Sequence, residues 1–184
     1  RAPFAQHDIP GFPGTKRLGS PERVTIAVAA FPNGHPRSRS TEQDIDTLLA
    51  KQAAGANLAI TQLFFDNADY FKFMDYMVGT LGVTVPITPG ILPIISTEQV
   101  KRFSALCGAR LPEHVTAQLN SLGEDLDGVI EFGIDFASRQ CEELLRRGAP
   151  GLHLYSLNQS RSSLQILKNL GLVAPDYLRS PVSE

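Results

Sequence analysis

The sequence is poor in cysteine, in net charge and in long apolar runs, and each shortage excludes a class of protein. Its 184 residues include two cysteines, Cys107 and Cys141, far apart and not in metal-ligand spacing, so we expect reduced thiols. A formal net charge of −2 gives no reason to expect a nucleic-acid or anionic-membrane surface. No apolar run is long enough to span a membrane and no signal peptide opens the chain, so we expect a cytoplasmic protein.

Several catalytic signatures are also missing. The sequence contains no G-x-S-x-G, no phosphate-binding loop, no H-E-x-x-H and no G-x-G-x-x-G. No pair of carboxylates stands out as an acid–base couple. These absences set aside the corresponding hydrolase, nucleotide-hydrolase, zinc-protease and dinucleotide-fold chemistries, and we expect no metal site.

The composition that is present predicts one soluble domain with an added arm. The chain is 42% hydrophobic and 20% charged, an ordinary globular balance. Residues 1–23 carry four prolines and three glycines without a period, which indicates an arm or linker. We expect the domain to span 24–172 and a tail to span 173–184. Because the first residue is Arg1, we also expect something to precede it, either a removed segment or a larger parent chain.

Apolar segments alternate with helical patterns along the domain. The predicted strands are Val24–Phe31, Ala56–Phe65, Val83–Ile91 and Gly151–Asn158, and we expect Pro86 and Pro89 to break the third of them. The predicted helices are Ser40–Ala54, Asn67–Leu81, Ser96–Cys107, Leu111–Leu122, Asp125–Arg147 and Ser162–Leu170. Continuously apolar strands that alternate with helices indicate a parallel sheet covered by helices. Four such units suit part of a TIM barrel, which needs eight, or a doubly wound sheet.

The turn "PNGHP" at 32–36 follows the first predicted strand and contains His35, which faces either solvent or a ligand. The helix after it begins at Ser40, which forms a possible capping box with Gln43. Asp44, Thr47 and Lys51 fall on one side of this helix. That polar stripe is either a solvated flank or a set of groups that grip a ribose hydroxyl and a phosphate.

Polar residues also interrupt the later apolar segments. Gln62 lies inside the apolar strand "AITQLFFD", where its amide either pairs with neighbouring backbone or reads a ligand. Gln99 and Phe103 share a helix face, and Phe103 is either a core residue or a surface for a flat ring. His153 and Tyr155 share one face of the last strand, which is either interior or packed on helices.

Four of these stretches together resemble the methylenetetrahydrofolate reductase family. They are "VAAFPNGHPRS", "AGANLAITQLFFD", "PITPGILPI" and "GLHLYSLN", in the family's order and spacing, and the match runs from 24 to about 172. The resemblance implies a TIM (β/α)8 barrel of which this chain supplies strands five to eight. It also implies an FAD-dependent oxidoreductase of one-carbon metabolism and methionine biosynthesis. In this family NAD(P)H reduces the flavin, which then reduces 5,10-methylenetetrahydrofolate to 5-methyltetrahydrofolate.

The resemblance also assigns ligand contacts. The implied FAD contacts are Ala29, Phe31, His35, Asp44, Thr47, Lys51 and Ala56. The implied contacts with folate or the nicotinamide are Gln62, Gln99, Phe103, Leu157 and Gln159. The chain departs from common family residues at Phe31, Thr47, Ala50 and Gln159, where tyrosine, asparagine, arginine and arginine are respectively frequent. Those departures remove ligand hydrogen bonds that other members make.

The family's first four strands have no counterpart in this sequence. The sequence therefore also lacks the family's strand-one glutamate, which acts as general acid, and the aspartate after strand four. No catalytic residue is assigned here. Glu42, Glu98 and Glu113 fall in helical or loop stretches rather than at a strand end. We therefore expect a fragment, a cleaved chain or one component of a two-part barrel. Its expected partners are the upstream half or another copy of itself.

Three functions remain open at this point. The first is a reductase half that works when the other half is present. The second is a non-catalytic half-barrel that serves as a binding or scaffold module, and the third is another flavin barrel of related build. The sequence does not choose between NADH and NADPH, and it gives neither the oligomeric state nor the length of the folate tail.

Overall fold

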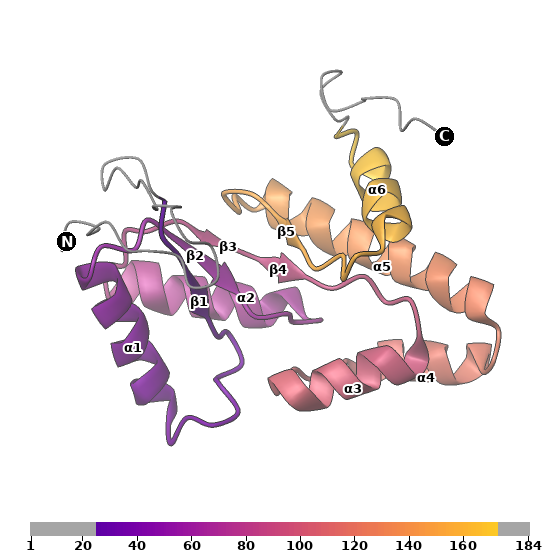
Figure 1. Cartoon of the computed structure of the whole chain (residues 1–184), viewed down its shortest axis with the longest axis horizontal. Helices are drawn as coiled ribbons and strands as arrows, with labels where there is room; N and C mark the ends of the chain where they lie inside the picture. Colours follow the sequence, from indigo (N-terminus) through magenta and orange to yellow (C-terminus); the bar gives the residue numbers. More distant parts are fainter. Residues whose placement is uncertain (1–24, 173–184) are drawn as a thin grey trace, which may run out of the picture.

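The computed structural model describes residues 25–172, so the predicted arm (1–23), Val24 and the predicted tail (173–184) lie outside it. The strands are β1 (Ala27–Ala30), β2 (Leu58–Thr61), β3 (Ile87–Thr88), β4 (Gly90–Ile91) and β5 (His153–Leu154) (Figure 1). The helices are α1 (Thr41–Ala53), α2 (Asn67–Met74), α3 (Thr97–Cys107), α4 (Glu113–Leu122), α5 (Leu126–Arg146) and α6 (Ser160–Asn169). A π-helical segment, η1 (Asp75–Thr80), continues α2.

The strands are parallel, as predicted, and neighbours in space follow chain order. β1, β2 and β3 form one sheet, with Ala29 opposite Ile60 and Ile60 opposite Thr88. β4 and β5 form a second, with Gly90 opposite His153. A doubly wound sheet reverses its strand order, whereas a barrel adds strands sequentially. The observed order is therefore consistent with a segment of a TIM barrel.

Each strand is shorter than predicted, and one of them is divided. The predicted strand Val83–Ile91 becomes β3 and β4, which belong to different sheets, and the break falls at Pro89, one of the two positions predicted. Beyond the break, the Gly90 N–H donates to the Thr61 hydroxyl rather than to the Thr61 carbonyl, so the β2–β3 ladder ends there. The predicted strand Gly151–Asn158 retains only His153–Leu154, because Leu157 and Asn158 adopt left-handed backbone angles.

Three helices also differ from their predicted bounds. The predicted helix Asn67–Leu81 is α-helical only to Met74 and π-helical beyond it, where Val78, Gly79 and Thr80 are weak helix formers. α4 begins at Glu113 rather than Leu111, because Pro112 disfavours helical geometry in the residue before it. α6 begins two residues before the predicted start.

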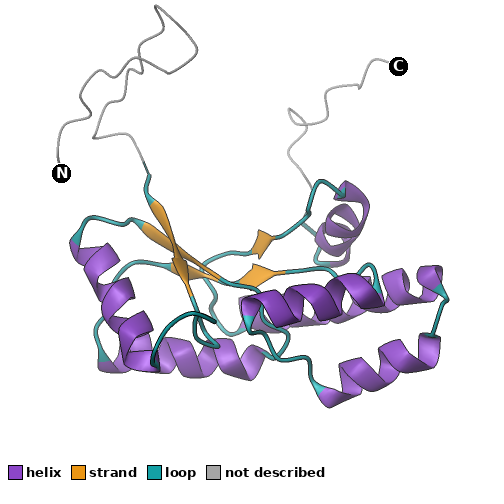
Figure 2. Ribbon diagram, turned by 60° about the horizontal axis from the view of Figure 1, so that its bottom comes forward, coloured by secondary structure: helices purple, strands orange, loops and turns teal. Residues whose placement is uncertain are grey.

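One face of the β1–β2–β3 sheet carries the core. Ala30, Ala59 and Ile87 are at most 2% exposed and pack with residues from α1, α2, α5 and α6. Most of the helical residues lie on one side of the strands (Figure 2). Alternate residues such as Ala27 and Ala29 point the other way and are exposed. Among the described residues, no helix covers this second face.

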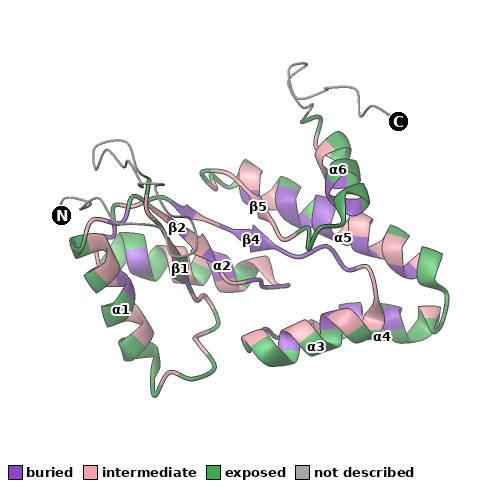
Figure 3. Ribbon diagram, viewed as in Figure 1, coloured by how far each residue is buried: buried purple, intermediate pink, exposed green. Residues whose placement is uncertain are grey.

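Burial follows the same division. Buried residues run along β2 and β4 and along the inner side of α5, while the outer side of α1 is exposed (Figure 3). None of the helices in residues 25–172 has the length and hydropathy that a membrane crossing needs.

Candidate functional site

The turn at 32–36 is attached to α1 by a carboxylate. Gly34, with φ of 79°, allows its N–H to close the turn on the Phe31 carbonyl at 3.1 Å. One oxygen of Asp44 accepts from the His35 backbone N–H at 2.8 Å, and the other accepts from the Ser38 hydroxyl. Asp44 therefore fixes this loop at two points, the His35 backbone and the Ser38 side chain.

The ring of His35 has a defined orientation. Its Nδ1 accepts a hydrogen bond from the Arg37 N–H at 3.1 Å, so in the neutral ring the proton is on Nε2. The ring lies edge-on to Phe31, with centroids 4.8 Å apart. His35 is half-buried and presents an N–H donor beside an aromatic surface.

The start of α1 fixes the polar stripe predicted on it. Ser40 Oγ accepts from the Gln43 N–H at 3.4 Å, as a cap should. The reciprocal bond of a capping box is shifted by one residue, since Gln43 Oε1 accepts from Arg39 N–H rather than from Ser40. With this start, Asp44, Thr47 and Lys51 all lie toward the end of β1.

Lys51 and Thr47 are partly committed within the protein. Lys51 Nζ donates to the Ala29 carbonyl at 3.0 Å and lies 5.9 Å from the centroid of the Phe31 ring. An ammonium group has three donors, so two remain for a ligand. The Thr47 hydroxyl donates to Gln43 O at 2.7 Å, which leaves its oxygen lone pairs as acceptors.

These side chains surround one cavity of about 340 Å³. Its wall contains all the predicted FAD contacts except Ala56, namely Ala29, Phe31, His35, Asp44, Thr47 and Lys51. Sequence reasoning missed four further wall residues, Ala30, Ser38, Leu48 and Phe73. Leu48 is a buried apolar residue of α1, and nothing in the sequence linked Phe73 of α2 to this helix. A second cavity of about 330 Å³ shares Phe31, Asp44 and Phe73 with the first.

Ala56 instead belongs to the end of α1. Its N–H donates to the Lys51 carbonyl at 3.0 Å, and Gly55 before it has φ of 99°. This is the geometry in which a left-handed glycine terminates a helix. Ala56 is buried and lies outside the cavity wall, so its expected FAD contact stays a prediction.

Gln62 follows the end of β2. Its N–H donates to the Ala30 carbonyl at 2.8 Å, and its Oε1 accepts from the Leu63 N–H at 3.0 Å. No described residue accepts from its Nε2 group. The amide therefore pairs with backbone through its oxygen, and its nitrogen is free to donate to a ligand.

Three of the predicted substrate contacts lie around a small cavity of about 10 Å³, namely Gln99, Leu157 and Gln159. Leu157 has φ of 48° and is 43% exposed. A non-glycine residue in this region is strained, and such strain clusters at functional sites. Phe103 does not line this cavity. It packs instead against a buried cluster that includes Leu92, Ile94 and Val100. Its stacking role stays a prediction.

The acidic residues lie where the sequence predicted. Glu42, Glu98 and Glu113 occupy the first turns of α1, α3 and α4, where carboxylates favour the helix dipole. Across residues 25–172, no group of three or more His, Cys, Asp or Glu side chains has the arrangement of a metal site.

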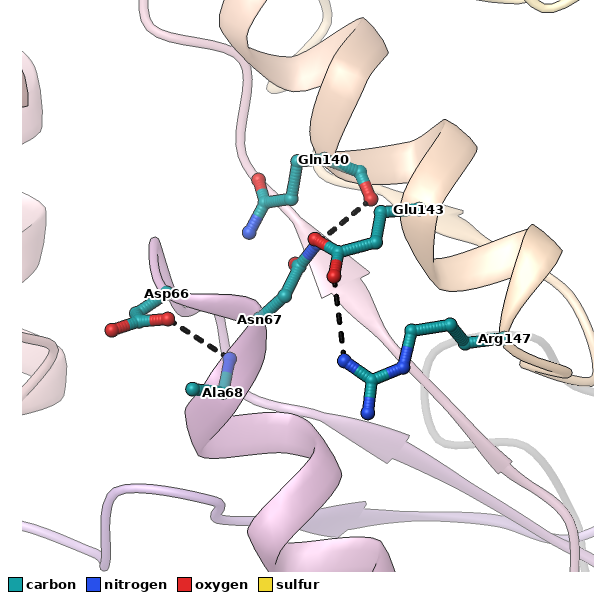
Figure 4. A network of polar contacts seen from close by, with 6 residues as sticks. All are labelled: Asp66, Asn67, Ala68, Gln140, Glu143 and Arg147. Atoms are coloured by element: carbon teal, nitrogen blue, oxygen red, sulfur yellow. Dashed lines mark hydrogen bonds and ion pairs between the residues drawn. The ribbon is translucent and has the colours of Figure 1, made fainter.

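A larger cavity of about 560 Å³ between α2 and α5 contains none of the predicted residues. Asn67 Nδ2 donates to Gln140 O at 3.1 Å and to Glu143 Oε2 at 2.8 Å (Figure 4). Arg147 donates to Glu143 Oε1 at 3.3 Å and lies 3.4 Å over the Phe71 ring. Because these charges are paired with one another, the network joins α2 to α5 and offers little to an outside ligand.

Comparison with known families identifies what these residues resemble. The family described as Methylenetetrahydrofolate reductase matches residues 17–171. A relative from Caenorhabditis elegans, named "Probable methylenetetrahydrofolate reductase (NADPH)", is 40% identical over 149 residues, covering 80% of this chain and 22% of that protein. "Methylenetetrahydrofolate reductase (NADH) 1" from Zea mays is 34% identical, covering 85% of this chain and 28% of that protein.

The "5,10-methylenetetrahydrofolate reductase" of Escherichia coli K12 is 34% identical over 174 residues, covering 90% of this chain and 58% of that protein. The chain thus spans 22% to 58% of the length of these curated relatives. A solved structure titled "Uncharacterized protein from Clostridium thermocellum binds two copies of 5-methyl-5,6,7,8-tetrahydrofolic acid" aligns with a TM-score of 0.49 and 18% identity, over 79% of this chain and 52% of that one.

Proposed function

We propose, because the chain belongs to the methylenetetrahydrofolate reductase family, that it forms strands five to eight of a TIM barrel that reduces 5,10-methylenetetrahydrofolate to 5-methyltetrahydrofolate. The parallel strands in sequential order and the uncovered sheet face support this placement. In such a barrel the uncovered face would point to the interior. Relatives are named for both NADH and NADPH, and the proposal covers either donor.

The two adjoining cavities beside α1 fit a flavin dinucleotide. Each is near the lower end of the usual volume of small-molecule sites, ~300–1,000 Å³, so a dinucleotide would span both. Phe31 and Phe73 offer apolar surface to a flat ring. The Lys51 ammonium is suited to a phosphate, and His35 Nε2 to a hydrogen-bond acceptor. When bound, FAD would supply hydride transfer between NAD(P)H and the folate.

Asp44 would act on the cofactor indirectly. Both of its oxygens already accept hydrogen bonds, from His35 and Ser38. Its main contribution would be to hold the His35 ring at the cavity and to balance the charge of Lys51. The family's direct contact at this position would use the remaining lone pairs of the carboxylate.

The folate would lie against the ends of β2 and β5. The Gln62 Nε2 group would donate to an acceptor on the pterin edge, since its oxygen is already bonded to the Leu63 N–H. Gln99 and Leu157, which line the small cavity after β5, would complete the contact. Gln159 would offer a neutral amide where many members have arginine.

Proton donation would come from outside this chain. Opening the five-membered ring of the substrate requires protonation of the departing nitrogen, and a positioned acid commonly contributes ~10²–10⁴ in rate. Glu42, Glu98 and Glu113 lie in the first turns of α1, α3 and α4 rather than at a strand end. The upstream half of the barrel would therefore supply the acid.

The observation that carries the proposal is the convergence of His35, Asp44 and Lys51, from a turn and a helix, on one cavity. The test is formation of 5-methyltetrahydrofolate with FAD and NAD(P)H supplied. The 184-residue chain alone should give no turnover, and addition of a relative's upstream half should give turnover and a flavin-coloured complex. A completed barrel that binds neither flavin nor folate would contradict the proposal.

A further inference from the structure

The two sheets are joined at Thr61 by side-chain hydrogen bonds. Continuing the pairing of Ile60 with Thr88 would bring the Gly90 N–H to the Thr61 carbonyl. Instead, Gly90 N–H donates to the Thr61 hydroxyl at 2.8 Å. The Thr61 carbonyl accepts from the hydroxyl of Tyr155 at 2.8 Å. The Tyr155 hydroxyl thus takes the place of the Gly90 N–H as the donor to the Thr61 carbonyl.

This contact depends on the absence of a side chain at residue 90. A Cβ on Gly90 would lie 2.3 Å from the Thr61 carbonyl oxygen and 2.7 Å from Tyr155 Cε2. The Tyr155 ring therefore passes directly over Gly90 to reach Thr61. Burial, and to a lesser extent the neighbouring Cys107, raise the pKa of Tyr155, so its hydroxyl remains a donor at neutral pH.

The hydrogen bond connects the two groups of predicted substrate contacts. On one side, Gln62 directly follows Thr61. On the other, Leu157 and Gln159 follow Tyr155, which lines the same small cavity as they do. Tyr155 N–H also donates to the Ile91 carbonyl at 2.8 Å, so its backbone is held in the sheet.

We propose that Tyr155 is a positioning residue for the folate, which sets the spacing between Gln62 and the Leu157–Gln159 loop. The inference rests on the proposed function, since it concerns the same substrate site. Tyr155 acts through the Thr61 carbonyl and not by touching the reacting atoms. The Gln159 N–H donates to the Ser156 carbonyl at 2.8 Å, which closes the turn directly after Tyr155, so a shift of Tyr155 carries this turn with it.

Tyr70 provides a matched control. Its hydroxyl donates to the Ile87 carbonyl at 2.8 Å, so it too is a buried tyrosine bonded to a strand carbonyl. It lies on α2 and lines none of the cavities that contain predicted ligand contacts. Tyr155→Phe and Tyr70→Phe therefore remove the same chemical group, from a half-buried and a buried site respectively, and both should lower the melting temperature.

The experiment is stopped-flow analysis of the two half-reactions in the complete protein that contains this chain. Tyr155→Phe should weaken methylenetetrahydrofolate binding by about tenfold, the effect of one lost hydrogen bond, and leave flavin reduction by NAD(P)H within about twofold. Tyr70→Phe should leave both half-reactions unchanged.

Other results would overturn the inference in distinguishable ways. Equal folate affinity in the two variants, or a Tyr155→Phe variant that unfolds while Tyr70→Phe stays folded, would assign Tyr155 to stability alone. A wild-type protein that reduces its flavin but never passes the hydride to folate would remove the proposed function and this inference together.

Discussion

The Asp44 carboxylate lies 2.8 Å from the backbone nitrogen of His35, and this bond ties helix α1 to the turn that ends β1. The second oxygen of Asp44 accepts from Ser38, three residues beyond His35. A single side chain thereby sets the position of the His35 ring relative to Lys51. The geometry of the proposed flavin cavity depends on it.

Asp44→Asn should weaken flavin binding. The amide is neutral, so its oxygen accepts more weakly from the His35 N–H, and its NH2 group can only donate to the Ser38 hydroxyl, which must turn from donor to acceptor. A neutral hydrogen bond contributes less than the ~1.5–3 kcal/mol of a bond to a charged group. Because Asp44 is only half-buried, we expect the lower end of that range, or about tenfold in the flavin dissociation constant. Flavin fluorescence titration measures it. Asp46→Asn, on the exposed side of α1, is the control, and equal affinities in the two variants would contradict the assignment.

Gly133→Ala should destabilise the fold. A Cβ there would lie 1.9 Å from the Ile94 carbonyl oxygen, so α5 would have to move off the loop after β4. Overpacking of this kind costs ~1–3 kcal/mol or more, which exceeds the ~1 kcal/mol that alanine gains over glycine in a helix. Urea denaturation gives the free energy of unfolding. In Gly79→Ala the new Cβ meets no atom within 4 Å, and that variant should not lose stability.

Alkaline pH should destabilise the protein through two buried groups. Burial raises the pKa of Cys141 from 9.0 to about 12 and that of Tyr70 from 10.0 to about 12. Above pH 9.0 for the thiol and pH 10.0 for the phenol, the unfolded chain releases protons that the native state keeps. The free energy of unfolding therefore falls as pH rises from 9 toward 12. Each group contributes a slope of up to ~1.4 kcal/mol per pH unit.

Removing the thiol should make that slope shallower. Cys141→Ala should reduce the fall in unfolding free energy most between pH 9 and 10, where the thiol of the unfolded chain titrates ahead of the Tyr70 phenol. Cys107→Ala removes a partly exposed thiol and should change the slope less. The same slope in wild type and Cys141→Ala would show that Cys141 ionises in the native state at its ordinary pKa.

Gln62→Glu should separate the two half-reactions. The carboxylate can still accept from the Leu63 N–H, but it has no donor to replace Nε2. An unpaired ring acceptor costs ~1–3 kcal/mol, so methylenetetrahydrofolate reduction in the complete protein should fall ~5- to 150-fold while flavin reduction by NAD(P)H is retained. As a control, Gln118→Glu makes the same change at an exposed position of α4. Equal damage to both half-reactions would argue against a pterin contact.

The parts of the site that could be predicted from the sequence are those within one stretch of chain. His35 follows its strand directly, and Asp44, Thr47 and Lys51 recur at helical spacing, so the family motif places them together. Phe73 is far from them in sequence and reaches the cavity only because α2 packs beside α1. No local pattern indicates such a contact.

The break of the third predicted strand at Pro89 follows from the sequence, but the contacts around the break do not. The Gly90 N–H donates to the Thr61 hydroxyl instead of the Thr61 carbonyl. That carbonyl accepts from the Tyr155 hydroxyl across 94 residues of chain, and no local pattern indicates such a contact. The strand bounds were overestimated because apolar residues such as Phe64 and Phe65 continue into buried loops beyond the ladder.

We propose that flavin lies between the end of β1 and α1. The most direct measurement of this is a crystal structure, with FAD, of the complete protein that contains this chain. We expect FAD in the cavity lined by Phe31 and Phe73, with His35 and Lys51 in contact with it and Asp44 still bonded to the His35 N–H. Flavin bound elsewhere, with His35, Asp44 and Lys51 turned to bulk solvent, would contradict it.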